Sequence, residues 1–299
     1  MNDKMIETFE AVVSEGSFAK AAEKLYCSNV TVMNQINTLE SETGVTLFNR
    51  TNHGADLTAA GRIFYEDMRR VTEMISKSVS RARQTAASGR KIIRVGTSIL
   101  RPCREITDIW KDIEQYHPEF QIMIVPFSDE PASLSSVLDD NSGIDCIVGP
   151  CDSSEWQTKY NIEVISQLSC MIGVPQRHRL AHRKKLSWAD LKGESIIMMK
   201  QGVSSAFGRL RSDISNNHHD IRIIDTSSIY TLDTFNVCDQ LNCLMETLDI
   251  WSGVHPSIKT IPVEWNHYSP YGIIFKKKPS PSLREFIDIT IDELTEPTR

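Results

Sequence analysis

Uncharged hydrogen-bonding side chains gather on one face of a segment near the N-terminus. Asparagine, threonine and serine carry donors and acceptors that match the edges of base pairs, and asparagine can pair with adenine through two bonds. The members of this set are Asn29, Thr31, Asn34, Asn37, Thr38 and Ser41. Val32, Ile36 and Leu39 recur at steps of four and three, which predicts a helix with one apolar stripe. A solvated face of an ordinary amphipathic helix has the same composition, so the face alone leaves both interpretations open.

Two short helices joined by a tight turn would hold this face in place. Ser17 is a suitable N-cap for the first helix and Ser28 for the second, which Gly44 is suited to end. A polar turn over residues 51–56, flanked by short apolar runs, adds a small wing. The sequence therefore predicts an all-α winged helix-turn-helix domain over residues 1–60, with one further helix in front of the pair.

Residues 1 to about 90 resemble the N-terminal module of the LysR-type transcriptional regulators. The resemblance is carried by Phe9, Val13, Gly16-Ser17-Phe18-Ala19-Lys20-Ala21-Ala22, Leu25, Ser28, Val32, Gln35-Ile36, Leu39-Glu40, Gly44, Leu47-Phe48, Arg50 and Leu57-Thr58-Ala59-Ala60-Gly61. It implies that double-stranded DNA is a partner and that paired modules read two half-sites. The residues expected to contact DNA are Lys20, Ser28, Asn29, Thr31, Met33, Asn34, Asn37, Thr38, Arg50 and His53.

The negative charge of the chain does not favour attraction to DNA phosphates. The formal net charge is -6, and acidic residues outnumber basic ones within residues 1–64. Affinity depends on cations that lie where phosphates pass, and Lys20, Arg50 and His53 are the candidates. We expect modest, strongly salt-dependent affinity from one module. Met33 and Asn34 stand where the family usually has a small polar and a basic residue, so the operator preference of its relatives does not carry over.

A long helical pattern follows over residues 58–88. Its apolar residues step by threes and fours, at Phe64, Met68, Val71, Ile75 and Val79. Nothing in the small N-terminal module could cover so long a seam, so we expect it to pair with a second copy of the chain. Packing onto the rest of the chain is the alternative. The family resemblance also implies a dimerising linker helix, in a dimer or tetramer, and residues 86–89 are expected to break the helix as a hinge.

Strand-like and helix-like segments alternate from residue 92 onward. This alternation favours an α/β fold with a mostly parallel sheet and helices on both faces. Short helices are expected over residues 133–138 and 187–191, among others.

The family resemblance implies a two-lobed α/β effector domain similar to the periplasmic binding proteins. Lobe one would cover residues 92–162 and 268–295, and lobe two residues 163–267. Where the family usually has a Gly-x-Gly turn, this chain reads Gln240-Leu241-Asn242. Glutamine disfavours the left-handed backbone, so a rebuilt turn is expected there.

Ligands of open α/β sheets bind beyond the carboxyl ends of the strands, where turns and helix N-termini present N–H groups. The residues expected to bind a ligand there are Thr97, Ser98, Leu100, Ser128, Gly149, Pro150, Gly202, Val203 and Ser204. Their hydroxyl groups would suit a small anionic or polar metabolite, although each serine or threonine could equally be a plain N-cap. Arg101 and Arg104 could supply charge for a carboxylate, or lie solvated.

The sequence contains no nucleophile elbow, Walker loop, HExxH motif or dinucleotide fingerprint, so we expect no catalytic residues and no cofactor. His178 and His182 are four residues apart, but we expect a solvated pair in a loop rather than a metal site. The seven cysteines lack metal-ligand spacing and predict reduced thiols. Cys238 and Cys243 leave open a thiol redox-sensing regulator of the same architecture, although their apolar surroundings are typical of core residues.

The N-terminus has no secretory signal pattern, and no apolar run reaches the roughly 18 residues needed to span a bilayer. We therefore expect a cytoplasmic protein without a membrane partner. The expected function is that of a bacterial-type, ligand-responsive DNA-binding transcriptional regulator. A small metabolite between the lobes would modulate how paired helix-turn-helix modules engage DNA. RNA polymerase would be a further partner if the protein activates transcription, and an enzyme is the remote alternative.

Overall fold

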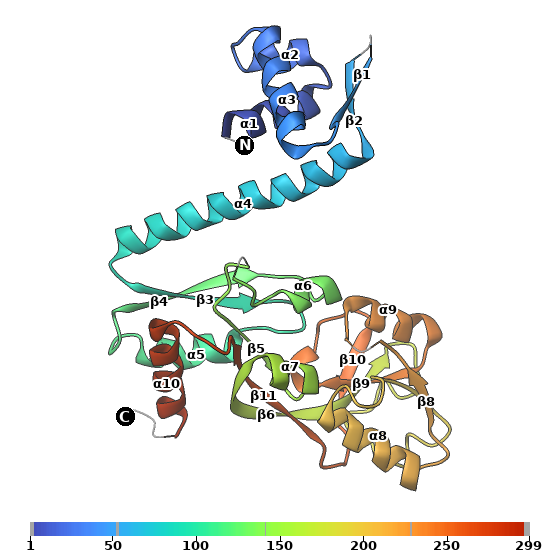
Figure 1. The fold of residues 1–299 in the computed structure, drawn as a ribbon. Helices are drawn as coiled ribbons and strands as arrows, with labels where there is room; N and C mark the ends of the chain where they lie inside the picture. The colour runs from blue at the N-terminus through green and yellow to red at the C-terminus, as the bar shows by residue number, and fades with distance from the viewer. Residues whose placement is uncertain (1–2, 52–53, 141, 228, 296–299) are drawn as a thin grey trace. The chain divides into compact units, whose positions relative to one another are not determined.

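The computed structural model describes residues 3–51, 54–140, 142–227 and 229–295 (Figure 1). The chain divides into two compact units, Met1–Ala86 and Ala87–Arg299.

The N-terminal unit is a winged helix-turn-helix, as the sequence predicts. Three helices come first, α1 (Asp3–Glu15), α2 (Phe18–Lys24) and α3 (Asn29–Thr43). The wing follows as the antiparallel strands β1 (Phe48–Thr51) and β2 (Gly54–Leu57). These elements share a small hydrophobic core because each of them presents one apolar face to the others.

The core of this unit is built on the predicted apolar stripe of α3. Val32, Ile36 and Leu39 are fully buried. Phe9 of α1 lies against Phe48 of the wing, with ring centroids 5.2 Å apart. The predicted caps also form: the Ser28 hydroxyl accepts from the Thr31 N–H at 3.1 Å, and Gly44 ends α3 in the left-handed conformation with φ +72°. Local sequence signals therefore fix both ends of α3.

One long helix, α4 (Ala59–Ser88), follows the wing. A Cβ on Gly61 would lie 2.1 Å from the carbonyl oxygen of Leu47, so only glycine lets the first turn of α4 approach the wing this closely. The helix continues through residues 86–88, so the break predicted over residues 86–89 falls at the last of them. It ends at Gly89, whose φ of +61° suits glycine. Within the described part of the chain, no helix has both the length and the apolar character needed to cross a membrane.

The predicted seam of α4 divides into two parts. Phe64 and Met68 are partly buried, and Phe64 packs edge-on against Phe9 at 5.1 Å. Val71, Ile75 and Val79 are 38%, 58% and 43% exposed, respectively. The second half of the seam therefore presents an apolar stripe to solvent.

The second unit is built on a single curled sheet, in which nine strands of the described residues pair. The strands are β3 (Lys91–Thr97), β4 (Phe120–Pro126), β5 (Cys146–Pro150), β6 (Asn161–Pro175), β7 (Ser195–Met198), β8 (Arg222–Asp225), β9 (Leu244–Leu248), β10 (Ile258–Ile261) and β11 (Tyr268–Phe275). Their order is β4-β3-β5-β11-β6-β9-β7-β8, and β10 also pairs with β6.

The sheet is mixed, so the prediction of a mostly parallel sheet is wrong. Strands pair in parallel at both ends, where β3 joins β4 and β5, and β7 joins β8 and β9. The central strands β6 and β11 run antiparallel to their neighbours because they carry the chain from one lobe to the other and back. β6 pairs with β11 over residues 161–169 and with β9 over residues 170–173 (Figure 1). This exchange of partners gives the predicted two-lobed α/β fold.

Helices cover the sheet in both lobes. They are α5 (Arg104–Ile113), α6 (Pro131–Ser135), α7 (Ser154–Lys159), α8 (Ser205–Asn217), α9 (Leu232–Leu241), the 3-10 turn η1 (Asp249–Trp251) and α10 (Pro281–Thr295). The closing helix α10 packs on α5, where the rings of Trp110 and Phe286 stack at 4.4 Å. Segments far apart in the sequence therefore share one hydrophobic core.

Three local predictions differ from the structure. Residues 187–191 form turns and not a helix, because the Asp190 carboxylate accepts from the N–H and hydroxyl of Ser187 at 2.9 and 2.8 Å. Such side-chain bonds compete with helical ones. The helix expected over residues 133–138 is a single turn, α6, which begins at Pro131. The third is the rebuilt turn expected at Gln240-Leu241-Asn242. Gln240 stays helical there, and Asn242 alone of the three adopts the left-handed conformation, with φ +48°.

Candidate functional site

The outer face of α3 carries the predicted DNA-binding side chains. They are exposed together on this helix and its cap: Ser28, Asn29, Thr31, Met33, Asn34, Asn37 and Thr38. Lys20 is exposed on α2. His53 lies outside the described residues. The face that the sequence predicts is thus continuous and open to a partner.

Three of these hydroxyl groups have bonds within the helix. Ser28 and Thr31 share a hydrogen bond between their hydroxyls at 2.8 Å, and the Thr38 hydroxyl donates to the carbonyl of Asn34 at 2.8 Å. Among the described residues, the side-chain amides of Asn29 and Asn34 have no bond. These two amides therefore carry the open donors and acceptors of the face.

Arg50, at the base of the wing, holds the amide of Asn37. Its Nη2 donates to Asn37 Oδ1 at 2.7 Å and to Glu40 Oε2 at 2.8 Å. The guanidinium also lies over the ring of Phe18, 5.2 Å from its centroid. Glu40 in turn accepts from the N–H of Leu47 at 2.7 Å. Sequence analysis missed Glu40, which joins α3 to the wing and orients Arg50.

Tyr26 is a second residue that sequence analysis missed. It occupies the turn between α2 and α3 with φ +52°, and it is 98% exposed. A left-handed backbone costs a residue with a Cβ about 1–2 kcal/mol. The sequence signal for this turn is that Tyr26 interrupts the helical spacing of the apolar residues. The turn thus presents an aromatic ring and a hydroxyl beside the start of α3, where they can contact a nucleic acid backbone.

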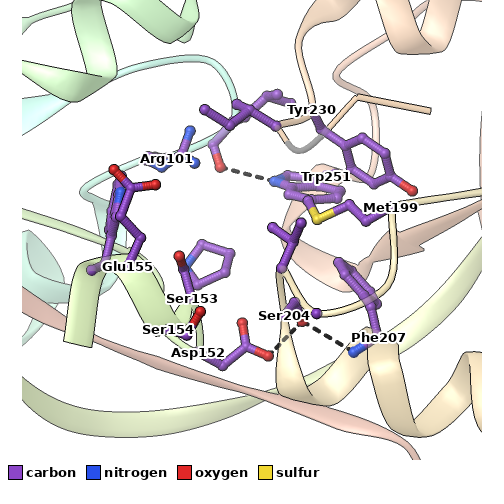
Figure 2. A pocket seen from close by; sticks show the side chains of 16 residues that line it. Arg101, Asp152, Ser153, Ser154, Glu155, Met199, Ser204, Phe207, Tyr230 and Trp251 are labelled. Atoms are coloured by element: carbon purple, nitrogen blue, oxygen red, sulfur yellow. Dashed lines mark hydrogen bonds between the residues drawn. The ribbon is translucent and has the colours of Figure 1, made fainter. Parts of the chain in front are cut away.

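A cavity of about 240 Å³ lies between the two lobes (Figure 2). Five of the predicted ligand residues line it: Leu100, Pro150, Gly202, Val203 and Ser204. The rings of Trp156, Phe207, Tyr230 and Trp251 form much of its wall. Thr97, Ser98, Ser128 and Gly149 are outside the lining. The carboxyl ends of the strands therefore mark the region of the cavity, but not every side chain in it.

Three hydrogen bonds cross between the lobes at this cavity. The Ser204 hydroxyl donates to Asp152 Oδ2 at 2.6 Å, and the same oxygen accepts from the Ala206 N–H at 2.8 Å. The Trp251 indole N–H donates to the carbonyl of Leu100 at 2.8 Å (Figure 2). Asp152 thus caps α8 from the opposite lobe, a role that sequence analysis missed because the partners are far apart in the chain.

Ser98 and Gly149 act on the cavity through Arg101. The guanidinium of Arg101 donates to Asp129 Oδ1 at 2.6 Å, and the Ser98 hydroxyl donates to the same oxygen at 2.7 Å. A Cβ on Gly149 would lie 3.0 Å from Arg101 Cγ, so glycine gives this side chain its room. Burial lowers the pKa of Arg101, and Asp129 opposes that shift. These contacts fix the one cation among the described lining residues.

The remaining predicted polar residues have ordinary structural roles. The exposed Ser128 hydroxyl accepts from the N–H of Glu130 at 3.2 Å, as a turn serine does. The Thr97 carbonyl accepts from the N–H of Phe127 at 2.9 Å and continues the sheet. Arg104 is exposed and pairs with Asp108 at 3.3 Å on the same helix.

A buried carboxyl group supports the cavity wall from behind. Glu246 on β9 has no exposed surface, and its Oε1 accepts from the Tyr230 hydroxyl at 2.8 Å and from the N–H of Met199. Both partners line the cavity. Burial raises the pKa of Glu246 to about 8, against its ordinary value of 4.5. At neutral pH this group is therefore mostly protonated.

The cysteine and histidine pairs are part of the packing. Cys238 and Cys243 are buried free thiols, and the Cys238 thiol donates to the carbonyl of Cys243 at 3.0 Å. A side-chain hydrogen bond with Cys243, together with burial, raises the pKa of Cys238 above its ordinary value, whereas the same bond lowers the pKa of Cys243. The reactive thiolate is therefore disfavoured at Cys238. The expectation of a solvated histidine pair is wrong for His178, which is buried and bonds Glu194 at 3.1 Å, whereas His182 is exposed.

Comparison with known proteins bears on both units. Residues 4–62 match the family model described as bacterial regulatory helix-turn-helix protein, lysR family. The HTH-type transcriptional regulator AlsR of Bacillus subtilis (strain 168) is 27% identical over 197 residues, 66% of this chain and 64% of the relative. The HTH-type transcriptional regulator ClcR of Pseudomonas putida is 42% identical over 88 residues, 29% of each chain. The chain thus matches less than two thirds of the length of these relatives.

The fold of the whole chain also has a counterpart. The crystal structure of full-length CbnR complexed with its target DNA covers 97% of this chain and 100% of its own, with a TM-score of 0.63 and 21% identity. At this identity the match shows the fold. Residues 4–62 thus match the helix-turn-helix model of the lysR family, and the chain as a whole has the fold of CbnR, a LysR family transcriptional regulator.

Proposed function

We propose that the protein is a DNA-binding transcriptional regulator whose α3 enters the major groove. The carrying observation is the exposed outer face of α3, on which the amides of Asn29 and Asn34 are open. These amides are suited to read base edges, while Asn37 does so in the orientation that Arg50 gives it. Tyr26 and Lys20 would contact the phosphate backbone beside the helix. CbnR, which shares the fold, has been crystallised with its target DNA.

One module alone should bind weakly. Lys24 pairs with Glu15 at 2.7 Å and Arg50 with Glu40 at 2.8 Å, so two of the few cations of this unit are already compensated. Fewer neutralised phosphates mean lower affinity and a smaller dependence on salt. Binding therefore depends on a second module, which the exposed stripe of Val71, Ile75 and Val79 on α4 would recruit by pairing with a second copy. The assembly is a dimer or a pair of dimers.

A small molecule in the cavity between the lobes would control this assembly. The bonds from Ser204 to Asp152 and from Trp251 to Leu100 hold the lobes in one relative position. A ligand that binds one lobe arrangement better than another shifts the population toward it and changes the spacing of the modules. Contact with RNA polymerase would follow if the regulator activates, and the proposal places the protein in the cytoplasm.

Selection of bound fragments from genomic DNA tests the proposal. We expect a preferred site with two half-sites, bound by the wild-type protein far more tightly than random DNA. Asn34→Ala should cost about 1–3 kcal/mol on the preferred site and little on random DNA. Glu42→Ala on the same helix, at an exposed position outside the predicted contact set, is the matched control. Equal losses on both DNAs would contradict base reading by α3, and the absence of any preferred site would contradict the function.

A further inference from the structure

We infer that the cavity between the lobes takes an organic amine, a positively charged nitrogen on an apolar or aromatic body. This inference rests on the proposed function, in which the same cavity holds the controlling ligand. Of the small anionic or polar metabolites that the serine and threonine residues suggest, it disfavours the anionic ones. Four observations carry it: the charge of the lining, a buried carboxylate oxygen, the aromatic wall, and the arrangement around Arg101.

The charge of the lining is negative once its ion pairs are taken into account. Arg101 is the one cation among the described lining residues, and Asp129 compensates it at 2.6 Å. Asp152 and Glu155 also line the cavity. Lys159, at the other end of α7 from Glu155, donates to the carbonyl of Ser135 and is not part of the lining. A cation entering the cavity therefore meets two carboxylates that no lining cation balances.

The mostly buried side chain of Asp152 supplies an acceptor that faces the cavity. The residue is only 7% exposed, and both of its hydrogen bonds, from Ser204 and Ala206, fall on Oδ2. Figure 2 shows the other carboxylate oxygen directed into the cavity. Among the described residues this oxygen has no hydrogen-bond donor. A buried carboxylate is stabilised by a donor that also carries positive charge, and an ammonium group supplies both.

The wall opposite these carboxylates is aromatic. Phe207, Tyr230 and Trp251 line the side of the cavity that belongs to lobe two (Figure 2). Aromatic faces attract cations and also bury an apolar body. Two carboxylates on one side of the cavity and aromatic rings on the other match an amphipathic amine better than a polar anion.

The surroundings of Arg101 limit which other classes of ligand the cavity can bind. Its Nη1 is bonded to Asp129, and its Nε is buried with no hydrogen-bond partner among the described residues. That N–H could donate to one further oxygen of a ligand, such as a carboxylate oxygen of an amino acid. A simple carboxylic acid would place its charge near Asp129 and Glu155 without any group for Asp152. An acid without an amine is therefore the disfavoured class.

Matched probes distinguish these classes. Phenethylamine, phenylacetate and L-phenylalanine share a benzyl group and differ in charge, and each is titrated into the full-length protein by calorimetry. We expect phenethylamine and L-phenylalanine to bind at least about tenfold more tightly than phenylacetate. Glu155→Gln, an exposed change on α7, should weaken phenethylamine selectively, and Asp152→Asn should weaken it by about tenfold or more. Glu114→Gln, at the exposed residue that follows α5 and outside the lining, is the control and should leave binding unchanged.

The proposal is overturned if phenylacetate binds as well as phenethylamine, if none of the probes binds, or if the two charge-neutralising variants bind phenethylamine as the wild type does. Selected genomic DNA is titrated against the same preparations. Normal DNA binding with the wrong probe preference overturns the ligand class alone. If the wild-type protein does not bind any DNA site specifically, the proposed function is overturned. The probe titrations still test the ligand class in that case.

Discussion

Asp152 and Ser204 lie in opposite lobes and are joined by a hydrogen bond of 2.6 Å. The same Ser204 hydroxyl accepts from the N–H of Phe207 at 3.1 Å, as the N-cap of α8. One side chain thus caps a helix, links the lobes and lines the cavity. A ligand that draws Asp152 toward itself would change all three relationships, which connects the occupied cavity to the arrangement of the lobes.

Ser204→Ala should destabilise the second unit by about 1–2 kcal/mol, because α8 loses its cap and Asp152 loses a donor. The tryptophans at positions 110, 156, 188, 251 and 265 all lie in this unit, so their fluorescence during urea unfolding reports on it alone. Ser212→Ala is the control, since this exposed hydroxyl bonds the Gly208 carbonyl of its own helix. An equal effect of both changes would contradict the role of Ser204.

Arg50 and Asn37 should act together in DNA binding, because the guanidinium of Arg50 orients the amide of Asn37 at 2.7 Å. In a double-mutant cycle on the preferred DNA site, Arg50→Ala and Asn37→Ala should show a coupling energy of at least about 0.5 kcal/mol. The cycle that combines Arg50→Ala with Asn34→Ala is the control and should be additive. Additive losses in both cycles would show that Asn37 reads DNA without help from Arg50.

Sequence patterns were sufficient where the determining contacts are local. The stripe of Val32, Ile36 and Leu39 and the caps at Ser28 and Gly44 define α3, and each acts within one helix. Sequence patterns failed at residues 187–191, where the Asp190 side chain accepts hydrogen bonds that compete with those of a helix. A hydrophobic period cannot report such competition.

The candidate sites were predictable as regions and not as sets of contacts. The rule for strand ends located the cavity, yet Asp152 and Tyr230 depend on pairings between residues far apart in the chain. Asp152 meets Ser204 across 52 positions, and Tyr230 meets Glu246 across 16. The DNA-binding face was predicted because it follows one helix, whereas the bond from Arg50 to Asn37 needs the wing to fold back onto α3. These partners are brought together by tertiary packing, so no local pattern in the sequence identifies them.

Ile75→Lys should shift the protein toward a monomer, because Ile75 is 58% exposed at the centre of the stripe that we expect to pair. Sedimentation equilibrium of the full chain measures this change, and affinity for a site with two half-sites should fall with it. Ser80→Lys adds the same charge at an exposed polar position on the opposite face of α4 and should leave the assembly intact. A dimer that survives Ile75→Lys would place the interface elsewhere.

Glu246→Gln should make the second unit more stable at pH 8 than the wild type, with a gain that disappears toward pH 5. The pKa of Glu246 is about 8 in the folded protein against an ordinary value of 4.5, because burial disfavours the carboxylate. Between these two values the folded chain retains a proton that the unfolded chain has released. The stability of the wild type therefore falls as pH rises, by up to about 1.4 kcal/mol per pH unit from this group.

Glutamine keeps the acceptor for Tyr230 and Met199 but has no proton to lose, so the variant should lack this part of the pH dependence. Urea unfolding of the full chain, followed by tryptophan fluorescence from pH 5 to pH 8, measures the difference between the two proteins. Glu114→Gln, at an exposed position, should retain the wild-type dependence. Parallel curves for the wild type and Glu246→Gln would mean that Glu246 is ionised in the folded protein, with a counter-charge or water at the buried Oε2 that has no partner among the described residues.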